Sequence, residues 1–213
     1  MNDMYDYNKI VEDLLKWYDA HARDLPWRRE PKPYYVWVSE IMLQQTRVEA
    51  VKGYFTRFIE ALPNIEALAN APEEQLLKLW EGLGYYNRVR NLQKAAITVM
   101  EEFHGELPAD YKELLTLKGI GTYTAGAIAS IAYGIQVPAV DGNVLRVMKR
   151  LAGSYDDIMK ASVKKEMEQT LSSVVPVRAG AFNQAIMDLG ALVCIPNGMP
   201  LCDRCPLAAT CEA

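Results

Sequence analysis

The chain has 213 residues, more than the roughly 100 to 200 typical of one domain, so we expect one large domain or two small interlocked ones. Half of the residues are apolar, but no apolar run reaches the roughly 18 residues of a membrane span and the acidic start does not resemble a signal peptide, which predicts a cytoplasmic protein without a membrane partner. The net charge of −4 and the pI of about 5.3 speak against a nucleic-acid partner, although the acid-free stretches 88–94 and 146–150 allow positive faces on an acidic body.

The N-terminal part of the chain predicts helices separated by prolines. An amphipathic helix covers residues 10–18, and we expect Pro26 to end it. The next helical stretch, VWVSEIMLQQT, places Glu40 inside an arc of apolar side chains. Burial of a carboxyl group raises its pKa above the ordinary value of about 4.3, which suits a general acid. Alternatively, Glu40 reaches solvent or pairs with Arg47.

Residues 51–105 continue the helical pattern without a convincing strand, interrupted by the stretch GLGYYNRVRNL. In this stretch Tyr85 and Tyr86 follow a Gly-x-Gly turn and precede Arg88 and Arg90. Aromatic and basic side chains interleaved in this way suit a wedge inserted between stacked bases. The alternative is a pair of half-buried tyrosines beside a solvated helix face.

The stretch LLTLKGIGTYTAGAIASIAYGIQVPAV predicts two helices joined by a glycine turn. Asp110 with Glu113 has the spacing of a capping box and opens the first helix. Gly119 and Gly121 allow a sharp turn with positive φ at both, and Thr122 is suited to start the second helix. Amides at such a turn face outward and favour an anion such as a DNA phosphate. A tight hairpin that only joins two core helices is the alternative.

Asp141 follows this nearly uncharged run and precedes GNVLRVMKRL, which has the apolar spacing of a helix. Asp is a favoured N-cap, so Asp141 either caps this helix or uses its carboxylate in chemistry, and the two roles are compatible. Further helices are expected over residues 159–175 and 179–194.

All cysteines fall within the last 20 residues of the chain. They are Cys194, Cys202, Cys205 and Cys211. Because nothing marks the chain as secreted, disulfides are disfavoured and a metal site is expected. The spacing alone suits either zinc or an iron-sulfur cluster.

Taken together, these segments resemble the catalytic core of the adenine DNA glycosylases of the MutY type, in the endonuclease III superfamily. The resemblance rests on RDLPWR, VWVSEIMLQQT, GLGYYNRVRNL, the glycine hairpin, VDGNVLRV and the cysteines, and covers nearly the whole chain. It implies an all-α, two-lobed helix-hairpin-helix fold: a six-helix lobe over residues 29–137, and an iron-sulfur cluster lobe over residues 1–28 plus 138–213. The cysteines then hold a 4Fe-4S cluster. The chain departs from the family in having Lys118 where Pro is usual, and seven rather than six residues between the first two cysteines.

The resemblance also implies roles for single residues. The catalytic residues it implies are Glu40 and Asp141, with Asn143 beside Asp141. The pocket around adenine is formed by Arg23, Trp27, Arg28, Leu43 and Gln184. Contacts to DNA come from Gln44, Gln45, Thr46, Tyr85, Tyr86, Arg88, Lys118, Gly119, Gly121 and Tyr123.

The activity implied is base excision repair by a monofunctional glycosylase. The expected partner is double-stranded DNA with adenine opposite 8-oxoguanine or guanine, bound by a monomer associated with the bacterial nucleoid. Glu40 protonates adenine at N7, Asp141 stabilises the sugar cation and water completes the hydrolysis. Endonuclease III carries a nucleophilic Lys at the position of Tyr123, so no Schiff base is expected there.

Three alternatives stay open: a mismatch thymine glycosylase, an oxidised-pyrimidine glycosylase of the same superfamily, and a non-catalytic DNA-binding module. The family usually carries a Nudix-like domain beyond the cluster that reads 8-oxoguanine, whereas this sequence stops two residues after Cys211. We therefore expect a piece of a longer protein, with weaker discrimination between 8-oxoguanine and guanine than a two-domain enzyme has.

Overall fold

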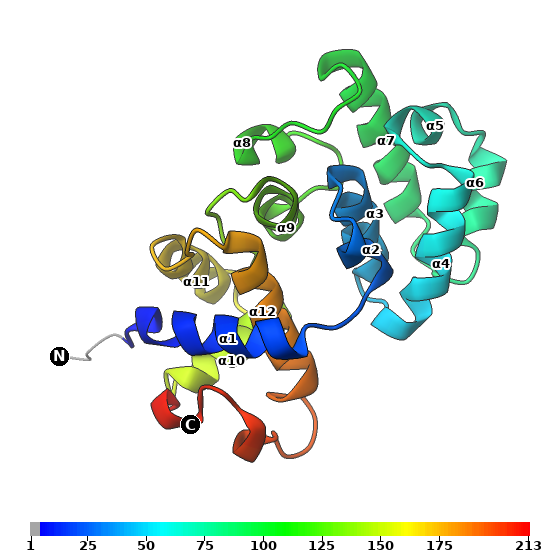
Figure 1. Ribbon diagram of the computed structural model, residues 1–213. Helices are drawn as coiled ribbons and strands as arrows, with labels where there is room; N and C mark the ends of the chain where they lie inside the picture. Colours follow the sequence, from blue (N-terminus) through cyan, green and yellow to red (C-terminus); the bar gives the residue numbers. More distant parts are fainter. Residues whose placement is uncertain (1–4) are drawn as a thin grey trace. The chain divides into compact units, whose positions relative to one another are not determined.

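The structure, a computed structural model, describes residues 5–213 and is helical throughout, with no strand in that part of the chain (Figure 1). This confirms the all-α prediction. Two compact units divide the chain: the described residues up to Arg23 together with Gly134–Ala213 form one, and Asp24–Tyr133 forms the other. The sequence placed these boundaries at 28/29 and 137/138. Among the described helices, none combines the length and apolar character needed to cross a membrane.

The first unit, here the N/C unit, is built on α12, against which α1 and α10 both pack (Figure 1). Its core includes Ile10, Leu14 and Phe182, all fully buried, and burying each contributes about 1.5–3 kcal/mol. Its helices are η1 (Tyr7–Ile10), α1 (Val11–His21), α10 (Gly142–Leu151), α11 (Ala161–Ser172), α12 (Ala179–Leu192), η2 (Cys202–Arg204) and η3 (Ala208–Thr210).

The second unit, here the hairpin unit, is organised around α3, which packs against α4, α7 and α9. Seven consecutive residues of α3, from Val36 to Met42, have buried side chains, which explains the central position of this helix. Its helices are α2 (Pro26–Arg29), α3 (Pro33–Leu43), α4 (Val48–Ala61), α5 (Ile65–Asn70), α6 (Glu73–Trp80), α7 (Asn87–Glu102), α8 (Tyr111–Leu114) and α9 (Thr122–Tyr133).

Several helix boundaries differ from the sequence-based expectation. The first helix already ends at His21, and Pro26 instead begins α2, where its missing N–H has no partner to lose. The helix expected over 159–175 is shorter, Ala161–Ser172. Apolar spacing predicts where a helix lies better than where it begins and ends. The end residues fray, and local hydrogen bonds determine which residue is the last helical one.

Candidate active site

Glu40 lies in the buried helix α3 and is only 5% exposed. The hydroxyl of Tyr123, at the start of α9, donates a hydrogen bond of 2.7 Å to its Oε2. The packing of α3 against α9 brings these residues together although they are 83 positions apart in sequence. The sequence left open that Glu40 reaches solvent instead of serving as a general acid. The structure contradicts that alternative, because Glu40 is buried. Sequence reasoning gave Tyr123 a contact to DNA and missed its contact to Glu40, because no local pattern reports which helices pack together.

The glycine hairpin between α8 and α9 forms as the sequence predicted, with one correction. Asp110 caps α8 by accepting from the backbone amides of Lys112 and Glu113. Gly119 has φ +83°, and a Cβ there would lie 3.1 Å from Cβ of Asn91, so both conformation and space require glycine. The expectation of positive φ at Gly121 is wrong, because the residue has no left-handed conformation and is open to solvent.

The hairpin exposes Lys118 beside Gly119, while Ile120 between the glycines is buried and anchors the turn. The backbone amide of Ile120 bonds to the carbonyl of Leu117, which closes the turn. An exposed turn that carries a cation, next to the start of the 12-residue helix α9, is a suitable place for a phosphate.

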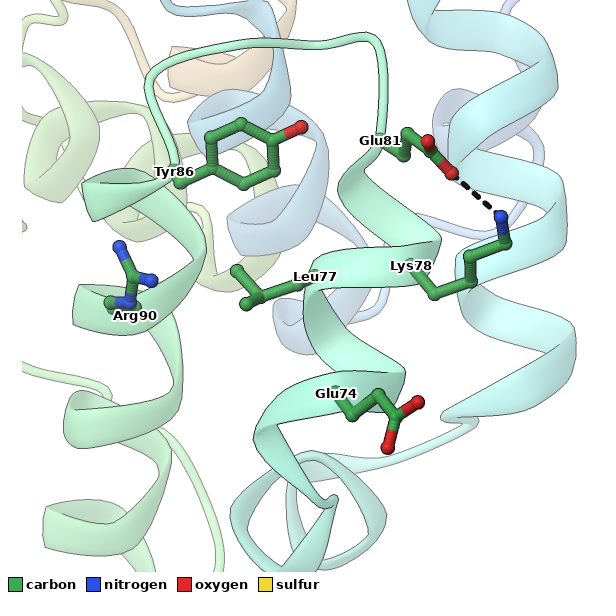
Figure 2. Close-up of a pocket in the computed structure, with 6 residues that line it drawn as sticks. All are labelled: Glu74, Leu77, Lys78, Glu81, Tyr86 and Arg90. Atoms are coloured by element: carbon green, nitrogen blue, oxygen red, sulfur yellow. Dashed lines mark hydrogen bonds and ion pairs between the residues drawn. The ribbon is translucent and has the colours of Figure 1, made fainter.

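Two further segments proposed for DNA contact share an unusual backbone. Tyr85 has φ +47° and is 65% exposed, and Gln45 has φ +58° and is also exposed. The left-handed conformation costs a non-glycine residue roughly 1–2 kcal/mol. Tyr86, by contrast, lines a surface groove of about 480 Å³ together with Leu77 and Arg90, and Figure 2 shows its ring turned over the α6 side of this groove.

Arg88 is directed into the hairpin unit. Its guanidinium donates to the carbonyls of Ile41, Met42 and Gln44 at the end of α3, and to those of Leu83 and Gly84. Burial lowers the pKa of Arg88, although the guanidinium stays charged at any physiological pH. The direct DNA contact expected of Arg88 thus competes with five backbone acceptors.

Asp141 caps α10 in the N/C unit, and both of its carboxylate oxygens are engaged. Oδ1 accepts from the backbone amide of Val144 at 2.8 Å, and Oδ2 accepts from the side-chain amide of Asn143 at 2.8 Å. Asn143 in turn accepts from Arg146, which also donates to the carbonyls of Gly190 and Cys194. The capping prediction is confirmed.

The residues proposed around adenine are distributed over both units. In the N/C unit Arg23 forms an ion pair with Asp188, which is 0% exposed, through N–O distances of 2.6 and 2.8 Å. Gln184 donates to the carbonyl of Gly180 within α12. The hairpin unit contains Trp27, whose ring meets the edge of Phe55, together with Arg28 and Leu43. Asp188 was missed by sequence reasoning, since an acid in an apolar helix gave no sign of its partner.

The four cysteines line one cavity of about 250 Å³ in the N/C unit. Burial raises the pKa of the Cys205 thiol; the backbone amide of Leu207 lowers it, and the three neighbouring cysteines raise it. Nη1 of Arg150 lies 3.3 Å from Sγ of Cys194, where it can stabilise a thiolate. The described residues hold no group of three His, Cys, Asp or Glu side chains gathered tightly enough for a single metal ion. Four thiols nonetheless line one cavity, and thiolates are ligands of zinc and of iron-sulfur clusters.

The loop between the first two cysteines, which is one residue longer than is usual in the family that the sequence resembles, is closed at its base and turned at a glycine. The amide of Leu201 bonds to the carbonyl of Val193 at 2.9 Å, which closes the loop at its base. Gly198 turns the loop with φ +80°. The first two cysteines therefore remain on the same cavity despite the longer connection.

The described residues are helical throughout, and a glycine hairpin precedes the buried helix α9. A buried glutamate bonds to a tyrosine of that helix, and four cysteines near the C-terminus line one cavity. This is the architecture of a helix-hairpin-helix protein. Comparison with protein families agrees: the chain belongs to the HhH-GPD superfamily of base excision DNA repair proteins, whose family profile matches residues 38–176.

Curated relatives and solved structures are similar over nearly the whole chain. An adenine DNA glycosylase of Homo sapiens is 46% identical over 99% of this chain, and one of Buchnera aphidicola is 41% identical over 96%. The chain covers 40% and 58% of these two relatives. A thermostable thymine-DNA glycosylase has a TM-score of 0.87 at 28% identity, covering 96% of this chain and 95% of that one. A non-covalent endonuclease III–DNA complex has a TM-score of 0.80 at 27% identity, covering 96% and 92%.

Proposed function

We propose that this chain is the catalytic part of a monofunctional DNA glycosylase that removes adenine mispaired with 8-oxoguanine or guanine. The observation that carries the proposal is Glu40, a carboxyl group buried in a core helix and held by the Tyr123 hydroxyl. Burying a carboxyl group costs stability, and buried titratable groups in this setting are candidates for acid–base catalysis. The relatives named above, which are adenine DNA glycosylases, support adenine as the base.

Glu40 acts first as an acid. Adenine leaves poorly as an anion, so Glu40 donates its proton to the base at N7, and the bond between C1′ and N9 breaks with the electron pair moving onto the protonated base. The hydroxyl of Tyr123 keeps the carboxyl group in one orientation during this transfer. Glu40 then accepts a proton from the water that attacks C1′, which restores its starting state.

Asp141 stabilises the positive charge that develops on the sugar. Its two oxygens are fixed by Val144 and Asn143, so the carboxylate is ordered before the substrate arrives. Asn143 is itself held by Arg146, which makes Asn143 a positioning residue for Asp141. The pairing of an acid with a second, ionised carboxylate parallels glycoside hydrolysis.

Double-stranded DNA is the proposed partner, bound by one copy of the chain. The exposed hairpin around Gly119 and Lys118 receives a backbone phosphate, and Tyr85 with Gln45 enters the base stack at the mispair. Extruding a base costs a few kcal/mol, less at a mispair, which contributes to selectivity. The endonuclease III–DNA complex, whose fold this chain shares, supports DNA as the partner.

The cysteine cavity is proposed to hold a 4Fe-4S cluster ligated by Cys194, Cys202, Cys205 and Cys211. When bound, such a cluster would tie the C-terminal loop, through Cys202, Cys205 and Cys211, to Cys194 just after the end of α12. Arg150 lies against Cys194 and offsets part of the negative charge of the four thiolates. Metal analysis of the purified protein distinguishes about four irons per chain from one zinc.

A thymine mismatch glycosylase is the second candidate, favoured by the TM-score of 0.87 to a thymine-DNA glycosylase. Incubation with four duplexes, carrying A opposite 8-oxoguanine, A opposite G, T opposite G and an oxidised pyrimidine, followed by alkaline cleavage, separates the candidates. Release of adenine alone supports the proposal. Release of thymine or an oxidised pyrimidine instead, or of no base while duplex binding persists, contradicts it.

A further inference from the structure

Three exposed non-glycine residues of the hairpin unit have the left-handed conformation: Gln45, Tyr85 and His104. Two of them lie in segments proposed to contact DNA, Gln45 in Leu43–Thr46 and Tyr85 in Leu83–Tyr85. Such a conformation persists only where surrounding contacts enforce it. We call these segments the glutamine loop and the tyrosine loop. They are about forty residues apart in sequence, and a third element forms hydrogen bonds to both.

Arg88, near the start of α7, is that element. Nη1 donates to the carbonyls of Ile41 at 3.1 Å and Met42 at 3.0 Å, and also to that of Gln44. Nη2 donates to the carbonyls of Leu83 at 2.9 Å and Gly84 at 3.3 Å. One planar guanidinium therefore joins the end of α3 and the glutamine loop to the tyrosine loop.

The surroundings of Arg88 explain why this group is an arginine. Its guanidinium lies over the rings of Trp80 and Tyr85, 5.4 and 5.6 Å from their centroids. Among the described residues no carboxylate forms an ion pair with it, so the charge is stabilised by carbonyl dipoles and ring faces. A lysine has three donors at a single point and cannot reach both loops from one plane.

We propose that Arg88 is a positioning residue that locks the glutamine and tyrosine loops together, so that Gln45 and Tyr85 enter the duplex as one rigid element. This rests on the proposed function, in which these two side chains open the mispair. In this arrangement Arg88 does not contact a phosphate. Its effect is on selectivity for a mispair, through the geometry of the two loops, rather than on the electrostatic attraction to any duplex.

The test compares Arg88→Met and Arg88→Lys with the matched control Arg90→Met. Arg90, labelled in Figure 2, lies two positions along the same helix and is exposed. It pairs with Glu73, so its loss removes the same charge and none of the bonds to the two loops. Three quantities are measured: amide hydrogen exchange of both loops without DNA, the ratio of Kd for a matched duplex to Kd for a duplex with A opposite 8-oxoguanine, and the slope of log Kd against log salt.

For Arg88→Met we expect faster exchange in both loops and a loss of about tenfold or more in the Kd ratio, the effect of losing one charge-assisted hydrogen bond. The salt slope should stay as in the wild type. Arg88→Lys should likewise keep the wild-type salt slope and lose the Kd ratio, and Arg90→Met should keep the wild-type Kd ratio.

If the slope of log Kd against log salt for Arg88→Met decreases by about one relative to the wild type while the Kd ratio is unchanged, Arg88 contacts a phosphate and the proposal is overturned. Unchanged exchange in one or both loops would overturn it as well. If Arg88→Met does not fold, Arg88→Lys alone decides: a wild-type Kd ratio contradicts the lock. The exchange measurement does not depend on catalysis. If the wild-type chain releases no adenine, the proposed function is contradicted, while the exchange data still test the role of Arg88.

Discussion

Replacing Tyr123 with Phe removes one hydroxyl and leaves the aromatic ring in place. The lost hydrogen bond, 2.7 Å to Oε2 of Glu40, has a buried carboxyl group as its acceptor. Hydrogen bonds to charged groups contribute about 1.5–3 kcal/mol. If the bond orients Glu40 in the transition state, this corresponds to a decrease of about 10- to 150-fold in the excision rate.

The assay is single-turnover release of adenine from a duplex with A opposite 8-oxoguanine, with Kd measured in parallel. Tyr123→Phe should lower the rate within that range and change Kd by less than about threefold. The matched control is Tyr133→Phe on the same helix, whose hydroxyl bonds to the backbone carbonyl of Leu107. The control should lose about 0.5–1.5 kcal/mol of stability and keep its rate. A Tyr123→Phe rate within twofold of the wild type would refute an orienting role for the hydroxyl.

Three further substitutions or measurements have defined outcomes. Asp141→Asn keeps a side chain that caps α10, so the melting temperature should hardly change while most of the excision rate is lost; a wild-type rate would reduce Asp141 to a cap. Asp188→Ala leaves Arg23 without its buried partner and should lower the free energy of unfolding by about 3–5 kcal/mol in urea titration, and a loss below 1 kcal/mol would show that the pair is not structural. The purified protein should be brown and contain about four irons per chain, and chelation of the iron should increase proteolysis after Cys194; one zinc in a colourless protein would contradict the cluster.

Local features of the fold could be predicted from the sequence. Asp110 and Asp141 were recognisable as caps because a cap bonds to amides two or three residues ahead, within the same stretch of sequence. Gly119 was recognisable because its turn needs a residue without Cβ. Pro26 was misinterpreted, since a proline is equally suited to follow one helix or to start the next.

The contacts that matter most for the site could not be predicted, because they join distant parts of the chain. Tyr123 meets Glu40 across 83 residues, Arg88 meets Gln44 across 44, and Arg23 meets Asp188 across 165. A helical pattern reports which face of a helix is buried but not the partner it is buried against. Glu40 within an apolar arc was visible in the sequence, whereas the hydroxyl that holds it required the packing of α3 on α9.

The central claim is that Glu40 supplies the proton that releases adenine, and Glu40→Gln tests it most directly. The amide has the shape of the carboxyl group and can still accept from Tyr123, but it has no acidic proton to give. In single-turnover assays on a duplex with A opposite 8-oxoguanine, we expect no detectable adenine release, with Kd for that duplex within about threefold of the wild type. Release of adenine at a rate near that of the wild type would contradict the claim.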